Sequence, residues 1–205
     1  VLTAFAVGMG YWYLVLANIA CVILLWLYST SFKRQLLVGN LVISLLTAWT
    51  ILVFFFAFSN PDHAFRSTDP LSVKFFRLSF LYAGFAFIIS LIREAVKDME
   101  DIKGDLRYGC RTLPIVAGIR TTKVYAAIWT GVLIATLLIL QFYVLQFGWI
   151  FSVLYAAVFV IVPLFVVLIK LRKATRTADF AALSSHTKWI MLTVILSMTF
   201  FLFYF

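Results

Sequence analysis

The stretch Glu94-Ala-Val-Lys-Asp-Met-Glu-Asp-Ile-Lys-Gly-Asp105 holds five of the eight acidic residues in the chain. Its three aspartates, Asp98, Asp101 and Asp105, are spaced i, i+3, i+7. On an α-helix this spacing predicts one shared face, which Glu94 joins from four residues earlier. Carboxylates in such a row repel one another, so the pattern predicts a counter-charge. Mg²⁺ is the usual one, because it takes one or two carboxylates and completes its shell with water and phosphate oxygens.

The residues around this stretch indicate a membrane protein. The 205-residue chain is 64% hydrophobic and 12% charged, with a mean hydropathy of +1.07, which excludes an ordinary soluble domain. We predict an all-α, polytopic transmembrane helical bundle that forms a single domain over residues 1–205. A partial helix is expected at residues 1–9. Six complete spans are expected after it, at residues 11–28, 36–58, 73–92, 124–146, 150–169 and 189–205. Pro163 is expected to kink the fifth span.

The net charge of +9 could suggest a nucleic-acid partner, but the positions of the basic residues argue against one. The segments 29–35, 93–123 and 170–188 hold fourteen of the seventeen Lys and Arg residues. Every second connection is therefore basic, as the positive-inside rule requires. We expect an integral protein of the cytoplasmic membrane with these three loops in the cytoplasm, a lipid bilayer as its surroundings and no nucleic-acid partner.

Two interpretations of the acidic row remain open at this point. A solvated helix end could carry ion pairs such as Lys97 with Asp101. A metal–diphosphate site would explain both the aspartates and the cations near them, because Lys and Arg neutralise phosphate oxygens that a metal leaves uncovered. In this second interpretation Lys97 and Arg111 bind the diphosphate, with Tyr28 and Lys33 as further partners. Tyr28 and Lys33 also fit an interface aromatic and a positive-inside anchor.

The run from Lys97 to Asp105, followed by Arg111-Thr-Leu-Pro114 and Gly118, resembles a known motif. It is similar to the second aspartate-rich motif, D-x-x-D-x-x-x-D, of the UbiA superfamily of intramembrane prenyltransferases. Together with the upstream segment from Tyr28 through Lys33 to Asn40, it looks most like the digeranylgeranylglyceryl phosphate synthase branch.

This resemblance implies nine transmembrane helices around a central cavity, in which two aspartate-rich motifs hold Mg²⁺ and a prenyl diphosphate. The six spans here would be helices four to nine. The first motif, N-D-x-x-D, does not occur in these 205 residues. The chain is therefore expected to lack its N-terminal helices and to be inactive alone. The resemblance assigns catalytic and metal-binding roles to Asp98, Asp101 and Asp105.

The implied reaction is Mg²⁺-dependent transfer of a prenyl group from a polyprenyl diphosphate to a membrane-soluble acceptor. The favoured pair is geranylgeranyl diphosphate and a prenylglycerol phosphate. An alternative is a transferase of the same superfamily that acts on a quinone, haem or chlorophyll precursor. A cation-coupled transporter or an inactive paralogue is the alternative from another class. A transporter predicts carboxylates in mid-span, whereas the acids here gather at one end of a span.

Overall fold

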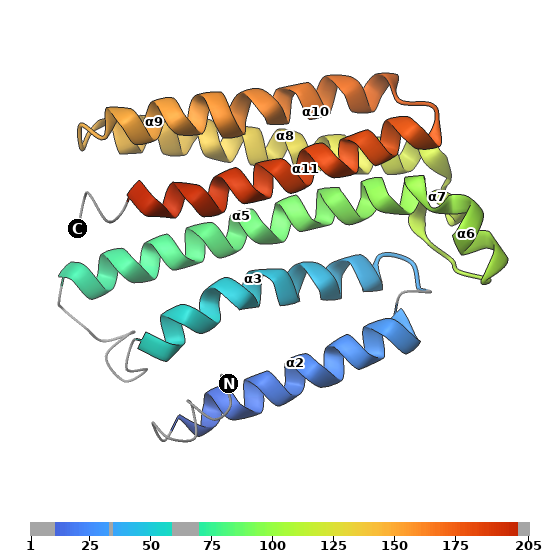
Figure 1. The fold of residues 1–205 in the computed structure, drawn as a ribbon, viewed down its shortest axis with the longest axis horizontal. Helices are drawn as coiled ribbons and strands as arrows, with labels where there is room; N and C mark the ends of the chain where they lie inside the picture. Colours follow the sequence, from blue (N-terminus) through green and yellow to red (C-terminus); the bar gives the residue numbers. More distant parts are fainter. Residues whose placement is uncertain (1–10, 33–34, 59–69, 201–205) are drawn as a thin grey trace. The chain divides into compact units, whose positions relative to one another are not determined.

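The structure is a computed structural model that describes residues 11–32, 35–58 and 70–200, and every regular element in these ranges is helical (Figure 1). This confirms the all-α expectation. The chain divides into two compact units, Val1–Ser90 and Leu91–Phe205. The boundary falls inside one long helix, α5 (Pro70–Glu100), which contributes to both units. The expected partial helix at residues 1–9 lies outside the described residues.

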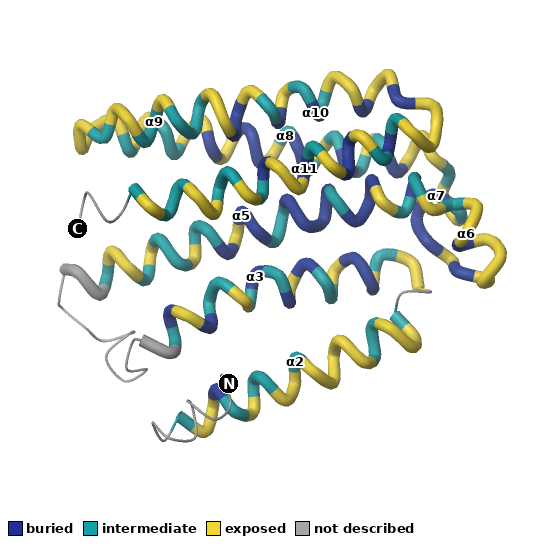
Figure 2. The backbone as a smooth tube through the Cα atoms, in the orientation of Figure 1, coloured by how far each residue is buried: buried dark blue, intermediate teal, exposed yellow. Residues whose placement is uncertain are grey.

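The first unit contains an antiparallel hairpin of α2 (Trp12–Thr30) and α3 (Val38–Phe58). Leu14 and Val53 form its buried centre. The Tyr13 hydroxyl donates to the Phe56 carbonyl at 2.8 Å, which ties the start of α2 to the end of α3. Apolar side chains otherwise cover α2 on most sides, and only Leu14 is buried there (Figure 2). Such a helix suits a lipid environment, where exposed apolar surface carries no cost.

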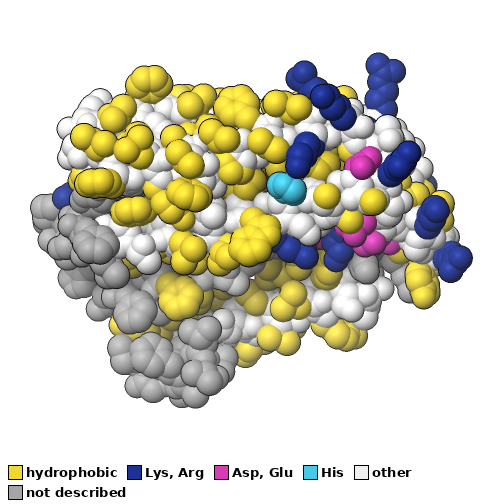
Figure 3. All heavy atoms as spheres, turned by 45° about the horizontal axis from the view of Figure 1, so that its top comes forward, with side chains coloured by type: hydrophobic (Ala, Val, Ile, Leu, Met, Phe, Trp, Pro, Cys, Tyr) yellow, Lys and Arg dark blue, Asp and Glu magenta, His cyan; other side chains and the backbone are white. Residues whose placement is uncertain are grey.

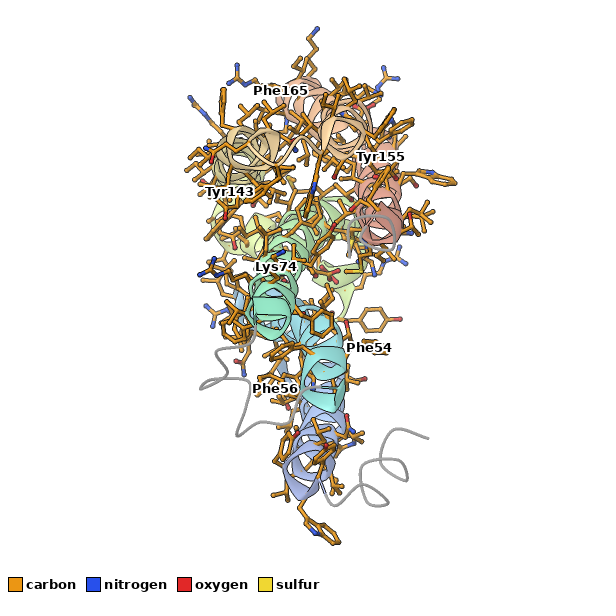
Figure 4. All side chains as sticks on the ribbon, turned by 90° about the vertical axis from the view of Figure 1, so that its left-hand side faces the viewer. Phe54, Phe56, Lys74, Tyr143, Tyr155 and Phe165 are labelled. Carbon is orange, nitrogen blue, oxygen red and sulfur yellow. The ribbon has the colours of Figure 1, made fainter. Side chains whose placement is uncertain are left out.

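Aromatic rings join α3 to the first half of α5. Phe55 is almost completely buried, and its ring lies 5.6 Å from that of Phe75 and 5.4 Å from that of Phe76. Phe54 is exposed, and it leaves α3 on a different side from Phe56 (Figure 4). Neighbouring phenylalanines of this run therefore divide between helix packing and the outer surface.

The second unit contains the end of α5, two short helices, and three long helical segments. The short helices are α6 (Ile102–Arg107) and α7 (Leu113–Val116). Helix α8 (Gly118–Leu145) turns at Gly148 into α9 (Ile150–Ala156), the π-helix η2 (Ala157–Ile161) and α10 (Val162–Lys173). Helix α11 (Thr177–Ser197) then packs against α10, and the 3₁₀ turn η3 (Met198–Phe200) follows.

A π-helix, η2, directly precedes the turn that contains Pro163, the residue at which a kink is expected. Proline has no N–H to offer the Phe159 carbonyl one turn earlier. The Thr193 hydroxyl of α11 donates to that carbonyl at 3.1 Å. The Tyr155 hydroxyl donates in return to the Thr193 carbonyl at 2.8 Å. Two hydrogen bonds thus satisfy backbone and side-chain groups where the regular α-helical pattern is interrupted, as a hydrocarbon environment demands.

Five of the described helices are long and apolar enough to cross a membrane: Trp12–Thr30, Val38–Phe56, Val73–Glu100, Gly118–Leu145 and Ile150–Lys173. They correspond to the first five expected spans. The expected sixth boundary is wrong, because α11 begins at Thr177 instead of residue 189. Much of the predicted basic loop at 170–188 is therefore helical, and its buried Phe180, Leu183 and Thr187 recur at helical spacing.

Candidate active site

The acidic stretch starts inside α5 and continues across a break in the helix. Helix α5 ends at Glu100, and Asp101 adopts φ −92° and ψ 6° before α6 begins. Its N–H donates to the Lys97 carbonyl at 2.9 Å, and its carbonyl accepts from the Asp105 N–H at 3.0 Å. Aspartate has a low helix propensity, which favours the end of α5 at this position. The expectation of one uninterrupted helical face is therefore wrong.

The three aspartates differ in their exposure to solvent. Asp98 on α5 is half-buried, Asp101 at the break is exposed, and Asp105 on α6 is 9% exposed. Carboxylates withdrawn from water need compensating partners. Asp98 and Asp105 are consequently the two aspartates that the fold shields, whereas Asp101 faces solvent.

Glu94 lies four residues before Asp98 on α5 and pairs with its neighbour Arg93. It is 6% exposed, and its Oε1 lies 2.5 Å from a guanidinium nitrogen of the half-buried Arg93. This ion pair compensates the buried charge next to the apolar part of α5. Arg93 is therefore the charge partner of Glu94.

Tyr125 lies in the first turns of α8, in the same compact unit as Asp98. The Tyr125 ring packs edge-on against Trp129, one turn further along α8, with 6.4 Å between the ring centres. Tyr125 was not among the residues predicted for the site. Its sequence signal is an aromatic pair at i, i+4 near the start of the span that follows the acidic segment and α7.

The turn after α6 fixes Asp105 in place. Gly109 adopts φ +66°, a conformation that glycine reaches without strain, and the Cys110 N–H donates to the Asp105 carbonyl at 2.9 Å. Thr112 then occupies the N-cap position of α7, with Pro114 in the first turn. Its side chain makes no capping hydrogen bond, and its buried hydroxyl has no hydrogen-bond partner among the described residues.

The four predicted diphosphate partners differ in where they lie in the chain. Lys97 and Arg111 belong to the same compact unit as the aspartates, and both are exposed. Lys33 lies outside the described residues. Tyr28 is half-buried on α2, in the other unit. The structure thus describes two of the four predicted diphosphate partners in the unit that holds the acidic row.

The donor atoms of this region suit a hard cation that shares its shell with phosphate. Within residues 11–32, 35–58 and 70–200, no group of three His, Cys, Asp or Glu side chains could hold a metal ion. A cage built entirely from protein ligands is therefore not formed by these residues. Mg²⁺ is commonly held by one or two carboxylates together with substrate phosphates, and Asp98 and Asp105 fit that limited donor set.

Comparison with known proteins decides the family. Residues 1–192 match the UbiA prenyltransferase family. The chain belongs to this family. It is 35% identical over 161 residues to the digeranylgeranylglyceryl phosphate synthase of Methanothermobacter thermautotrophicus, which covers 77% of this chain and 50% of that protein. No solved structure matches the chain.

Two further relatives of the same name are similar over shorter regions. The Methanosphaera stadtmanae protein is 34% identical over 110 residues, or 54% of this chain and 35% of the relative. The Sulfurisphaera tokodaii protein is 30% identical over 140 residues, or 68% of this chain and 46% of the relative. The chain thus spans about half or less of the length of these relatives. Family and helix composition together make this UbiA-family chain an integral membrane protein.

Proposed function

We propose that the protein transfers a prenyl group from a polyprenyl diphosphate to a membrane-soluble acceptor, with Mg²⁺ as cofactor. The favoured donor is geranylgeranyl diphosphate, and the favoured acceptor is a prenylglycerol phosphate. The proposal rests chiefly on the placement of Asp98 and Asp105 on consecutive helices at the end of an apolar span, in a chain of the UbiA family. The names of the relatives support the choice of acceptor.

In this proposal Asp98 and Asp105 hold the cation, and the exposed Asp101 contributes directly or through water. The bound ion neutralises the diphosphate and makes it a better leaving group. Lys97 and Arg111 donate hydrogen bonds to the phosphate oxygens that the ion leaves uncovered. Lys33 and Tyr28 stay predicted diphosphate partners on the basis of the sequence alone.

The apolar residues behind the aspartates have a separate task. Ala95, Val96 and Met99 are buried on the last turns of α5. They keep water from one side of the reacting centre, which protects an allylic cation from hydrolysis. The acceptor hydroxyl then attacks the allylic carbon, the carbon–oxygen bond to diphosphate breaks, and the hydroxyl proton leaves to solvent or base.

We also propose that the site faces the cytoplasm. The segments 29–35, 93–123 and 170–188 carry most of the basic residues, and the acidic row lies in the second of them. Water-soluble diphosphate and Mg²⁺ are available on that side. Single cysteines at Lys103 and Lys173 should react with an impermeant thiol reagent only from the cytoplasmic side. Labelling only from the outside would contradict this orientation.

A transfer assay on the full-length protein in lipid tests the reaction. Labelled geranylgeranyl diphosphate and geranylgeranylglyceryl phosphate are supplied with and without Mg²⁺. Asp98→Asn and Asp105→Asn should lose product formation, whereas Asp179→Asn, a carboxylate elsewhere in the same unit, should retain it. The full-length protein is used because this chain spans about half or less of the length of its relatives.

The possible outcomes test the identity of the acceptor and the role of the aspartates independently. Product that requires Mg²⁺ and disappears in both site variants supports the whole proposal. Diphosphate binding without product would support the site and move the acceptor to quinone, haem or chlorophyll precursors. Activity that survives in both site variants would refute the proposed role of the aspartates.

A further inference from the structure

The turn between α10 and α11 presents a dense group of exposed cations. Lys170, Arg172, Lys173 and Arg176, called here the cationic turn, are all exposed and lie within seven residues. Lys and Arg side chains gather at this end of the molecule, whereas hydrophobic side chains cover much of the remaining visible face (Figure 3). The proposed reaction uses none of these four residues.

Buried contacts hold the backbone of the cationic turn in one conformation. The Lys123 ammonium of α8 donates a hydrogen bond to the carbonyl of Ala174, the C-cap residue of α10. The same ammonium lies 5.7 Å from the centre of the buried Phe180 ring. Leu171 and Ala174 are also buried. The four cations therefore project from a fixed support.

The acidic residue of this segment does not neutralise the cations fully. Asp179 is the single acidic residue between positions 170 and 188. Its Oδ2 accepts hydrogen bonds from the backbone N–H groups of Thr175 and Arg176, both at 2.9 Å. Its charge thus stabilises the start of α11. The four cations therefore have one nearby carboxylate, and that carboxylate already accepts two backbone hydrogen bonds.

The position of the turn in the fold indicates what these cations meet. The segments Gly118–Leu145 and Ile150–Lys173 are both apolar enough to span a membrane, and the Lys123–Ala174 contact joins the start of the first to the end of the second. The turn follows immediately where the apolar segment ends. Charges there lie at the level of lipid headgroups.

We propose that the cationic turn binds the phosphate groups of anionic phospholipids. Topology alone explains a bias of basic residues to one side, but it requires neither a fixed backbone nor the engagement of the local carboxylate. Arginine at positions 172 and 176 suits phosphate, because its planar guanidinium can donate two parallel hydrogen bonds. The bound headgroups would hold the ends of α8 and α10 at the membrane surface.

The test measures which lipids the full-length protein retains. The protein is placed in nanodiscs of phosphatidylcholine with a minor fraction of phosphatidylglycerol, and the lipids that remain bound after mild extraction are quantified by mass spectrometry. The variant Arg172→Gln/Lys173→Gln/Arg176→Gln is compared with Lys74→Gln/Arg77→Gln, which removes exposed cations from the start of α5. Thermal unfolding in the same nanodiscs checks that each variant is folded, and Lys173→Gln alone replaces the triple variant if that one fails.

The wild type should enrich phosphatidylglycerol over its bulk fraction, and the enrichment should fall about five-fold for each removed charge of the turn. The α5 variant should keep the enrichment, and added sodium chloride should reduce it in the wild type. Equal enrichment in the turn variant and the wild type would overturn the proposal. Inorganic phosphate that displaces the lipid far better than sodium chloride of equal ionic strength would also overturn it, in favour of a site for soluble phosphate.

Discussion

Thr193→Val tests how the second unit tolerates a proline inside a membrane helix. The Thr193 hydroxyl shares its one proton between the Phe159 carbonyl at 3.1 Å, which Pro163 cannot serve, and the Ile190 carbonyl of its own helix at 2.9 Å. Valine keeps the shape of the side chain but removes the donor, so the Phe159 carbonyl loses this partner. Interhelical hydrogen bonds in membranes contribute about 0.6 kcal/mol on average and about 1.7 at most, whereas an unsatisfied buried group costs about 1–3. We therefore expect Thr193→Val to lower the free energy of unfolding by about 1 kcal/mol.

A double-mutant cycle isolates the mechanism. Pro163→Ala restores an N–H that can serve the Phe159 carbonyl, so Thr193→Val should cost much less in that background. Unfolding is measured by denaturing detergent in mixed micelles. Thr136→Val is the control, because the Thr136 hydroxyl bonds only within its own helix, to the Val132 carbonyl at 2.9 Å. An equal loss from Thr193→Val with and without Pro163 would refute the reasoning.

Three further predictions concern the same unit. Lys123→Met should lower the free energy of unfolding by about 1–2 kcal/mol, because it removes the hydrogen bond to the carbonyl that ends α10 and the contact with an aromatic ring, as a thermal melt would show. The backbone N–H groups before α11 lower the pKa of Asp179, so its contribution to stability is complete above about pH 4 and is lost as the pH falls through the lower pKa of the folded state. Thermal melts of Asp179→Asn across this range should show a weaker acid dependence than the wild type, and an acid dependence equal to that of the wild type would contradict the assignment. Gly118→Ala, at φ +85°, should destabilise by about 1 kcal/mol, whereas Gly131→Ala, inside α8 with open space around its Cα, should stabilise by about 0.5–1 kcal/mol; chemical unfolding of the pair should therefore give opposite signs.

Hydropathy and charge predicted most of the architecture, because each reflects a strong local constraint. Long apolar runs must form helices in lipid, where unpaired backbone groups are expensive. The first five spans therefore appear close to their predicted positions. The start of α11 was missed because its first turns mix Asp179, His186 and Lys188 with apolar residues. The apolar positions of that segment recur with the period of a helix, and this periodicity indicates the start of α11 better than mean hydropathy does.

The candidate site was only partly predictable, for a different physical reason. The residue types and spacing of the aspartates pointed to cation and phosphate chemistry, and the structure leaves that hypothesis as a proposal. The burial of Asp105 depends on how the chain packs around α6, and the pairing of Glu94 with Arg93 depends on the side-chain conformations of two neighbours on α5. Helical spacing carries no information on such contacts, and the break at Asp101 also escaped it.

Binding of geranylgeranyl diphosphate to the full-length protein, titrated in nanodiscs with and without Mg²⁺, is the most direct test of the aspartate site. Tight binding should require Mg²⁺ in the wild type and in Asp179→Asn, and it should weaken by at least about tenfold in Asp98→Asn and in Asp105→Asn, because each loses a charged ligand. Affinity in both site variants equal to that of the wild type would show that the diphosphate is bound elsewhere.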